Sequence, residues 1–291
     1  MAIFNGIGSN LRGSAGNWTF TRLAGQTIAK QKVNTKGTSP RTFAQMVRRV
    51  AWANIVNMWR AFEGLDRPSF EGRDPRHSDF NEFMGANLDV VPVFLDKEEA
   101  RAGGCVAAPY QVTRGSLPSI GLENGDGGVV KTSVQLGDLV IGSNTTVAEF
   151  SNAVLTNNRD FAAGDNITVF VVHQLLDAAT GVPRVEVSES NVTLDPEDSV
   201  TLLFDTAMQE AFSTVDGVLG MSGSMDGAVV YIHSRKTASG TAVSTQRLLA
   251  KNAILASYQT ATKRDEAIAS YGGKTQPLYL TPNGNDVEVQ H

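Results

Sequence analysis

The chain has 291 residues, of which 41% are hydrophobic and 19% charged, and its formal net charge is −5. This composition is typical of a globular protein with one large or two ordinary domains, and no apolar run is long enough to span a membrane. Cys105 is the only cysteine, which excludes an intrachain disulfide framework and a zinc site built from cysteines.

Basic side chains are concentrated near the N-terminus. The first 62 residues contain nine Lys or Arg and no Asp or Glu, whereas residues 77–291 contain 13 basic and 26 acidic residues. A basic segment of this kind can dock on the acidic body of a neighbouring copy, contact nucleic-acid phosphates, or remain a solvated face without a partner. Because the nine charges do not form a dense polybasic tract, we favour the neighbouring copy and place nucleic acid second.

The first predicted element is a β-hairpin from Trp18 to Val33. Apolar and polar residues nearly alternate on both sides of Gly25, which is the pattern of two paired strands joined by a glycine-containing turn. Four glycines lie in residues 5–16, but neither a preceding buried strand nor the Gly-Lys-Ser/Thr ending of a phosphate-binding loop accompanies them. We therefore interpret these glycines as positions that permit positive φ and close backbone approach.

A long helix is predicted over residues 39–63. Ser39 is a suitable N-cap, Pro40 occupies the favoured first position, and Gly64 follows the last turn. Apolar residues recur at three- and four-residue spacing over a wide arc: Phe43, Met46, Val47, Val50, Ile55, Met58, Trp59 and Phe62. Such an arc is typical of a helix covered on more than one side, by core or by a subunit interface. The remaining polar strip is expected to hold three arginines: Arg48, Arg49 and Arg60.

Helices and short β-prone runs are mixed between residues 66 and 164. HSDFNEFMGANLD predicts a helix capped by Ser78, and TTVAEFSNAVLTNN predicts another whose capping box is Thr146 and Glu149. Residues 89–142 contain the β-prone runs VVPVFL, VAAPYQVT, GGVVKTSVQLG and LVIG, which are separated by glycines.

Antiparallel β structure is predicted from residue 165 onward. ITVFVVHQLL and PRVEVSES flank a loop that contains Gly181, and VTLLFD, GVLGMSGS and AVVYIHSRK follow at about ten-residue spacing, as in a sandwich or barrel. SGTAVSTQRLLAKNAIL predicts a further strand, and TATKRDEAIASYGG predicts a terminal helix that ends at Gly272. The polar tail TPNGNDVEVQH is expected to form a closing strand or to contact a neighbouring copy.

These elements together predict an α+β, mainly β fold, in which an N-terminal β-hairpin and a long helix are joined to an antiparallel sandwich-like or barrel-like body. Three modules are expected: a basic N-terminal arm with the hairpin and helix (residues 1–65), a mixed α+β module (residues 66–164), and an antiparallel β module with a terminal helix (residues 165–291).

Residues suited to catalysis or metal binding are few and follow no motif. His173 and His233 lie in predicted strands among apolar residues, where a core or sheet-face histidine is the better interpretation. No His or Cys spacing suits a metal site, and GMSGS at 220–224 departs from a nucleophile elbow at its last position. We therefore predict no catalytic, cofactor-binding or metal-binding residue and no cofactor, and we expect the protein not to be an enzyme.

Four stretches, in this order, resemble a little-characterised family of proteins of unknown function from gut bacteria and from their phages and prophages: GSAGNWTFTRLAGQTIAKQKV, RTFAQMVRRVAWANIVNMWRAF, GDNITVFVVHQLL and STQRLLAKN…AIASYG. The chain departs from that family in the length of residues 89–142. The resemblance brings no catalytic residues with it, and its phage context implies a virion component of the tail, of the neck or associated with the capsid.

The physical features fit a structural protein of this kind. A virion component needs self-complementary surfaces, which a basic arm, a helix apolar on more than one side and an acidic body would supply. We expect a homo-oligomer located in the virion, made in the host bacterial cytoplasm, with copies of itself and other virion proteins as partners. The predicted assembly interface contains eight residues: Trp18, Phe20, Arg22, Lys30, Lys32, Arg48, Arg49 and Trp59.

An isolated two-stranded hairpin is marginal in water, so it needs a covering surface, either the predicted helix 39–63 of its own chain or a partner. We expect the order of residues 1–36 to depend on a neighbouring subunit. Two other functions remain open. The basic arm could contact nucleic acid, and the β-body could be a surface-binding or carbohydrate-binding module that exposes aromatic residues. The body offers few aromatics for that second role: Phe170, Phe204, Tyr231 and Tyr258.

Overall fold

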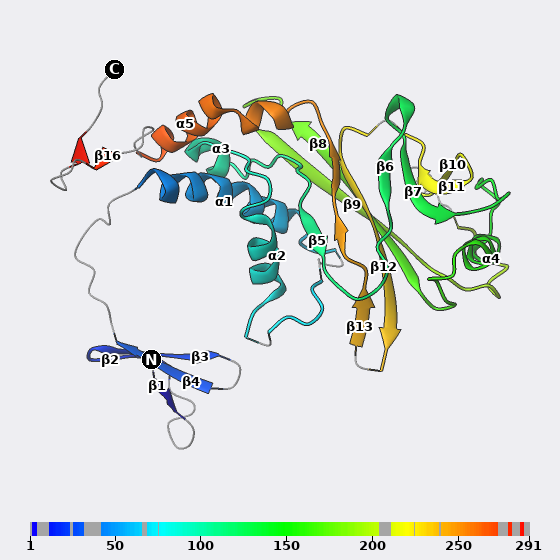
Figure 1. The fold of residues 1–291 in the computed structure, drawn as a ribbon, viewed down its shortest axis with the longest axis horizontal. Coiled ribbons are helices and arrows are strands. Elements are labelled where there is room, and N and C mark those ends of the chain that lie inside the picture. The colour runs from blue at the N-terminus through cyan, green and yellow to red at the C-terminus, as the bar shows by residue number, and fades with distance from the viewer. Residues whose placement is uncertain are drawn as a thin grey trace.

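The computed structural model describes residues 2–4, 12–23, 26–31, 42–65, 69–74, 76–203, 211–223, 225–238, 240–272, 279–280 and 286–287. Within these residues helices combine with antiparallel sheets, so the predicted α+β, mainly β fold class is confirmed. No sheet in this part of the chain closes into a barrel, and the body is layered (Figure 1). None of the described helices has the length and apolarity needed to cross a membrane.

The N-terminal arm sheet contains β1 (Ala2–Phe4), β2 (Gly13–Ala15), β3 (Trp18–Leu23) and β4 (Gln26–Gln31), in the order β1-β4-β3-β2. The predicted hairpin is confirmed as β3 paired antiparallel with β4, with Phe20 opposite Ala29. Its residues 32–33 and the first two of the four glycines lie outside the described residues. β1 pairs with β4 and β2 pairs with β3, so the two strands extend the hairpin at both edges. Neither strand was predicted, because three residues are too few for an alternating pattern to be visible. Gly13 and Gly16 have φ of 104° and 54°, as expected for positions that need positive φ.

Helix α1 (Phe43–Ala61) is the predicted long helix with a later start. Thr42 is its N-cap, because the Thr42 hydroxyl accepts a hydrogen bond from the Gln45 backbone N–H and the Gln45 side chain accepts one from the Thr42 N–H. Thr42 has extended backbone angles, so α1 does not continue back to the predicted cap. Ser39 and Pro40 lie outside the described residues.

Two surfaces of α1 are buried. Near its end, Ile55 and Met58 join the core against the central sheet. Near its start, Met46 and Val50 pack against helix α5 (Ala261–Ser270). The wide apolar arc of the sequence therefore corresponds to a helix that is covered on more than one side.

The other helices are α2 (Asp79–Asn87), α3 (Lys97–Arg101), α4 (Val147–Asn157) and α5. Ser78 caps α2 as predicted, and Thr146 with Glu149 forms the predicted capping box of α4. Thr260 caps α5, and the positive φ of Gly272 follows its end. α3 was not predicted, because five residues are too few for a helical periodicity to be visible.

The strands of the body are β5 (Gln111–Thr113), β6 (Leu122–Asn124), β7 (Val130–Gln135), β8 (Asn166–Leu176), β9 (Pro183–Thr193), β10 (Ser213–Val215), β11 (Val218–Met221), β12 (Gly227–Thr237), β13 (Gly240–Val243), β14 (Gln246–Arg247) and β15 (Leu249–Lys251). The central sheet has the order β13-β12-β8-β9, with β15 also paired to β12. A smaller sheet has the order β10-β11-β7-β6, and β5 pairs with β14. In the C-terminal tail, β16 (Tyr279–Leu280) pairs with β17 (Asp286–Val287).

Several predicted strands are wrong. VVPVFL and LVIG are irregular in the structure, although Val93 and Leu95 are buried. The prediction failed because a short apolar run alone does not distinguish a strand from a buried loop. The described part of VTLLFD contributes only an isolated bridge between Leu202 and Thr146. In VAAPYQVT only the last three residues form a strand, and SGTAVSTQRLLAKNAIL is divided into β13, β14 and β15.

The central sheet is buried on both faces along most of β8 and along the first seven residues of β12. Alternate residues of β8 and β12, such as Phe170 and Val230, pack against α1 and α2, whereas Val169 and Tyr231 pack against the smaller sheet and α4. Figure 1 shows this order, with α1, α2, α3 and α5 on one side of the central sheet and β6, β7, β10, β11 and α4 on the other. Because both faces are covered, β8 and β12 read as almost continuous apolar runs.

Segments from both sides of the expected module boundary at residues 164–165 share sheets. β7 pairs with β11, and β5 pairs with β14. The pairing therefore joins residues that lie more than 80 positions apart in the sequence, as between Val130 and Met221.

Candidate functional site

Four of the eight predicted interface residues lie in the arm sheet. Cross-strand partners share a face of an antiparallel sheet, so the register places Trp18, Phe20 and Arg22 on one face and Lys30 on the other. The Trp18 side chain is 46% exposed, Arg22 and Lys30 are exposed, and Phe20 is half-buried. Lys32 lies outside the described residues.

The arm sheet has little core of its own. Among its residues whose exposure is defined, only Thr27 and Ala29 are buried. In Figure 1 the sheet stands apart from α1 and from the layers of the body. A small antiparallel sheet needs a second layer to be stable in water. The described part of the body does not supply that layer, so the arm sheet is a candidate surface for a partner.

The predicted arginines of α1 are at the surface. Arg48 forms an exposed ion pair with Asp89, with 3.5 Å between its Nη2 and the carboxylate. Arg49 lies over the ring of Tyr271, with 5.9 Å from its guanidinium carbon to the ring centre. Exposed contacts of this kind contribute little to stability. Helix α1, which carries both arginines, stands apart from the arm sheet (Figure 1).

Trp59 is half-buried and packs against helix α2 of its own chain. Its ring centre is 5.7 Å from that of Phe80 and 5.4 Å from that of Phe83, so it packs α1 against α2. The exposed aromatic residue of α1 is Trp52, whose side chain is 43% exposed. Trp52 was not predicted from the sequence. It lies four residues after Arg48 and three after Arg49, so the helical spacing places it on the same polar strip.

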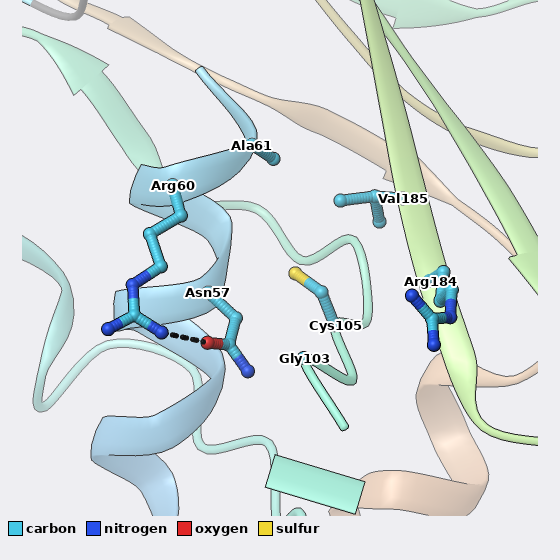
Figure 2. Close-up of a pocket in the computed structure, with 7 residues that line it drawn as sticks. All are labelled: Asn57, Arg60, Ala61, Gly103, Cys105, Arg184 and Val185. Atoms are coloured by element: carbon cyan, nitrogen blue, oxygen red, sulfur yellow. Dashed lines mark hydrogen bonds between the residues drawn. The ribbon is translucent and has the colours of Figure 1, made fainter. Parts of the chain in front are cut away.

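A pocket of about 250 Å³ lies between α1, the segment after α3 and the beginning of β9. Figure 2 shows its lining, which consists of Asn57, Arg60, Ala61, Gly103, Cys105, Arg184 and Val185. Arg60 extends from the last turn of α1 and Arg184 from β9, on opposite sides of Cys105 (Figure 2). No motif in the sequence indicated this pocket, because its walls come from three separate segments.

Buried amide side chains of α1 hold one wall of the pocket in place. The Asn54 side chain donates to the Val106 carbonyl at 2.9 Å and accepts from the Val106 N–H at 2.7 Å. The Asn57 amide donates to the Gly104 carbonyl at 2.7 Å. A Cβ on Gly104 would approach the Glu99 carbonyl oxygen to 2.7 Å, so this position requires glycine. The sequence signal was present, since two asparagines interrupt the apolar arc of the helix.

Gln174 of β8 fixes the same wall from the sheet side. Its amide nitrogen donates to the Arg184 carbonyl at 2.8 Å and to the Cys105 carbonyl at 3.2 Å. Its amide oxygen accepts from the Ala107 N–H at 2.8 Å. Since Gln174 is buried, these bonds satisfy polar atoms that have no access to water. The segment that carries Cys105 is therefore held rigidly between the helix and the sheet.

The pocket carries positive charge and no nucleophile. Arg60 makes one long contact, from its Nη1 to the Asn57 amide oxygen at 3.4 Å, and no described carboxylate pairs with it. Arg184 Nε lies 3.3 Å from an Asp177 carboxylate oxygen, which leaves its other nitrogens available. Burial raises the pKa of the Cys105 thiol well above its usual range, so the thiol stays protonated and unreactive at neutral pH.

A second polar cluster joins the buried side chains of Asp165 and His233 to the partly exposed side chain of Arg235, with His233 and Arg235 on β12. Asp165 receives hydrogen bonds from His233 Nε2 at 2.8 Å and from two guanidinium nitrogens of Arg235 at 2.6 and 2.7 Å. The His233 ring stacks on Phe161 with ring centres 4.3 Å apart. Arg235 also donates to the Asp160 carbonyl at 3.0 Å. The cluster holds residues 160–165 against β12, and its charges are used in that contact.

The structure separates the two strand histidines. His233 is a buried core histidine, as predicted, and His173 is exposed on the sheet surface. Register places His233 opposite Ile167 and His173 opposite Gly227, at different ends of the β8–β12 pair. Among the described residues, no three side chains of His, Cys, Asp or Glu are grouped so that they could hold a metal ion.

No protein-family model matches the chain, and no curated protein or solved structure is significantly similar to it.

Proposed function

We propose that the protein is a non-enzymatic structural protein that assembles with copies of itself, and that its arm sheet docks on the body of a neighbouring copy. The observation that supports this most directly is the state of the arm sheet. It exposes Trp18, buries only Thr27 and Ala29 among its residues whose exposure is defined, and stands apart from the described layers of the body (Figure 1). A sheet in that state gains stability when a second layer covers it.

Burial of Trp18 provides a driving force. If roughly 100 Å² of its ring surface is removed from water on docking, the gain is about 2.5 kcal/mol at 25 cal/mol per Å². Exposed tryptophans that become buried are frequent energetic centres of interfaces. Trp18 is therefore the residue of the arm sheet on which assembly depends most.

Charge complementarity favours a neighbouring copy as the partner. The first 62 residues carry nine positive charges and no negative ones, and residues 77–291 carry a net charge of −13, from 13 basic and 26 acidic residues. Opposite potentials on the two surfaces accelerate their association and orient them. The chain's own α1 is the other candidate surface, but the arm sheet does not lie on it (Figure 1).

The two alternative functions have less support. Arg22 and Lys30 lie on opposite faces of the arm sheet, so this sheet does not present a single basic face to a nucleic acid. For a carbohydrate-binding module, Phe170 and Tyr231 would need to be exposed, but both are buried. Phe204 lies outside the described residues, and Tyr258 is half-buried with its hydroxyl 2.9 Å from Glu99.

The place of this assembly in nature is proposed from the resemblance of the four quoted stretches. Self-assembly through a basic arm suits a phage virion protein of the tail, of the neck or associated with the capsid, made in the cytoplasm of the host bacterium. Homo-oligomers of this kind need matched surfaces and no catalytic machinery.

A pair of tryptophan variants tests the proposal. Trp18 and Trp52 are exposed to nearly the same extent, 46% and 43%, but only Trp18 lies in the arm sheet. Trp18→Ala should weaken self-association by at least about tenfold in light scattering and sedimentation, because it removes the proposed anchor. Trp52→Ala should leave it unchanged.

Deletion of the arm gives a second test of the same proposal. A chain that lacks residues 1–36 should keep a folded body and no longer oligomerise, and high salt should weaken the assembly of the intact chain. A truncated chain that assembles with unchanged stoichiometry would contradict the proposal. Salt-dependent binding of DNA by the intact chain, lost with the arm, would favour the nucleic-acid alternative instead.

A further inference from the structure

The pocket between α1 and β9 has two cationic walls and no described carboxylate in its lining. Arg60 and Arg184 face it from opposite sides (Figure 2). Arg60 forms no ion pair with the described residues, and Arg184 uses only one edge of its guanidinium for Asp177. A guanidinium offers a planar fork of N–H donors, whose natural partner is an anion with two oxygens.

Backbone donors of the pocket are already used. Gly103 N–H donates to the Ala100 carbonyl at 3.3 Å, Gly104 N–H to the Glu99 carbonyl at 2.8 Å, and Cys105 N–H to the Pro183 carbonyl at 2.8 Å. Phosphate sites commonly rely on free backbone N–H groups at a helix start or in a nest. This lining offers side-chain guanidinium donors, which pair with carboxylates and phosphates alike. The apolar Ala61 and Val185 in the lining favour an anion carried on an aliphatic stem over free phosphate.

Between the two arginines the lining is uncharged and largely apolar. Ala61 and Val185 contribute methyl groups on the side of the pocket opposite the Asn57 amide, and Cys105 contributes a thiol that burial keeps neutral (Figure 2). An aliphatic stem can contact this surface while its charged end reaches a guanidinium. The Asn57 amide oxygen accepts from Arg60 Nη1 at a long 3.4 Å and carries no full charge, so it is a weak competitor for a carboxylate.

We propose that this pocket binds a carboxylate carried on a short aliphatic stem. Arg60 is the principal contact for the carboxylate and Arg184 the second, and the apolar lining receives the stem. The same chemistry is presented by a free dicarboxylate and by a glutamate side chain of an acidic partner chain. This site is separate from the arm sheet, and its occupancy does not depend on the self-assembly proposed above.

Titration of the full-length chain with glutarate, followed by calorimetry and by amide chemical shifts, tests the proposal. Glutarate should bind with a Kd tighter than about 10 mM. Arg60→Gln and Arg184→Gln should each weaken binding by about tenfold or more, because each removes a charge-assisted contact. Arg159→Gln is the matched control, since Arg159 is also an exposed arginine but lies outside the pocket. Circular dichroism of each variant checks that the fold is kept.

Two further ligands define the chemistry. 1,5-Pentanediol, which has the same stem without charges, should not bind, and inorganic phosphate should bind more weakly than glutarate. A short glutamate-rich peptide that binds more tightly than glutarate would assign the site to a partner chain, and a peptide that binds no better would assign it to a free dicarboxylate.

The proposal fails if glutarate does not bind, if phosphate binds as tightly as glutarate, or if Arg159→Gln weakens binding as much as the two pocket variants. Oligomerisation is measured separately with the Trp18 and Trp52 variants. A failure of the carboxylate proposal therefore leaves the proposed self-assembly standing, and a failure of self-assembly leaves the carboxylate proposal standing.

Discussion

Two kinds of polar side chain connect segments inside the body. Neutral amides such as Asn54 hold neighbouring segments together, and the carboxylate of Asp165 pairs with His233 and Arg235. In the cluster, burial opposes the charge of Asp165, but hydrogen bonds from Arg235, from the Ala162 N–H and from His233 outweigh it and hold the pKa of this carboxyl below its usual range. A lowered native pKa stabilises the fold above the unfolded value of about 3.9, and that stabilisation is lost as the pH falls through the native pKa.

Replacement of Asp165 tests this account at the residue scale. Asp165→Asn should lower the free energy of unfolding by about 1–3 kcal/mol at pH 7, because the buried Asp165 carboxylate then no longer accepts the charge-assisted hydrogen bonds of the partly exposed Arg235. The loss should shrink when urea unfolding is repeated near pH 3, below the unfolded pKa of about 3.9, because there the unfolded chain binds a proton and the wild type gains less from its native carboxylate. Asp160→Asn is the control, because Arg235 contacts the backbone carbonyl of Asp160, which this substitution keeps. An equal loss at both pH values would show that the charge of Asp165 does not contribute.

Among the elements, α1 depends on polar contacts as much as on its apolar arc. Asn54 lies in the buried part of this helix and bonds both the N–H and the carbonyl of Val106, and its amide also donates to the Tyr110 hydroxyl at 2.8 Å. Asn54→Leu keeps the approximate volume but leaves these buried groups without partners, which costs about 1–3 kcal/mol for each unsatisfied group. We expect an overall loss of about 3 kcal/mol in chemical denaturation.

The matched variant for that prediction is Asn152→Leu, at an exposed position of α4, where the change should alter stability by no more than about 0.5 kcal/mol. If Asn54→Leu were as stable as the wild type, the amide contacts would not be what holds residues 104–108 against α1. A shift of Asn54→Leu toward slower unfolding would contradict the argument in the same way.

For the whole molecule, the layered body and the arm sheet should differ in local stability. β8 and β12 lie between two apolar clusters and pair along most of their length, so their amides should exchange hydrogen most slowly. The arm sheet buries only Thr27 and Ala29 among its residues of defined exposure, so its amides should exchange quickly in dilute protein and slowly at concentrations that favour assembly.

Hydrogen exchange followed by mass spectrometry, at two protein concentrations, measures this difference directly. The proposed arm docking would be contradicted by an arm sheet that is as well protected in dilute protein as in concentrated protein. In Trp18→Ala the arm should remain unprotected at both concentrations. Protection of β8 and β12 should be the same in all samples, which provides an internal reference.

Sequence patterns predicted the elements whose signals are local. The Trp18–Val33 alternation, the apolar arc of residues 43–62 and the capping box of Thr146 and Glu149 each depend on residues within about four positions of one another. The structure shows the arc and the capping box, and it shows the hairpin as far as Gln31. The hairpin around Gly181 was also predicted from its sequence, and β8 and β9 pair along their full length. For these elements the sequence alone was sufficient.

Other features were decided only when distant segments met. The last three residues of VVPVFL are buried in an irregular segment, because Val93 and Leu95 pack in the cluster that contains the end of α1 and Phe94 packs in the cluster between α1 and α5. Apolar character alone could not show this. Pairings such as β7 with β11 and the convergence of Arg60, Cys105 and Arg184 join residues far apart in the chain. Short-range patterns indicate which residues are buried and where helices begin. They do not indicate which surface packs against which, because that depends on contacts between segments that are far apart in the sequence.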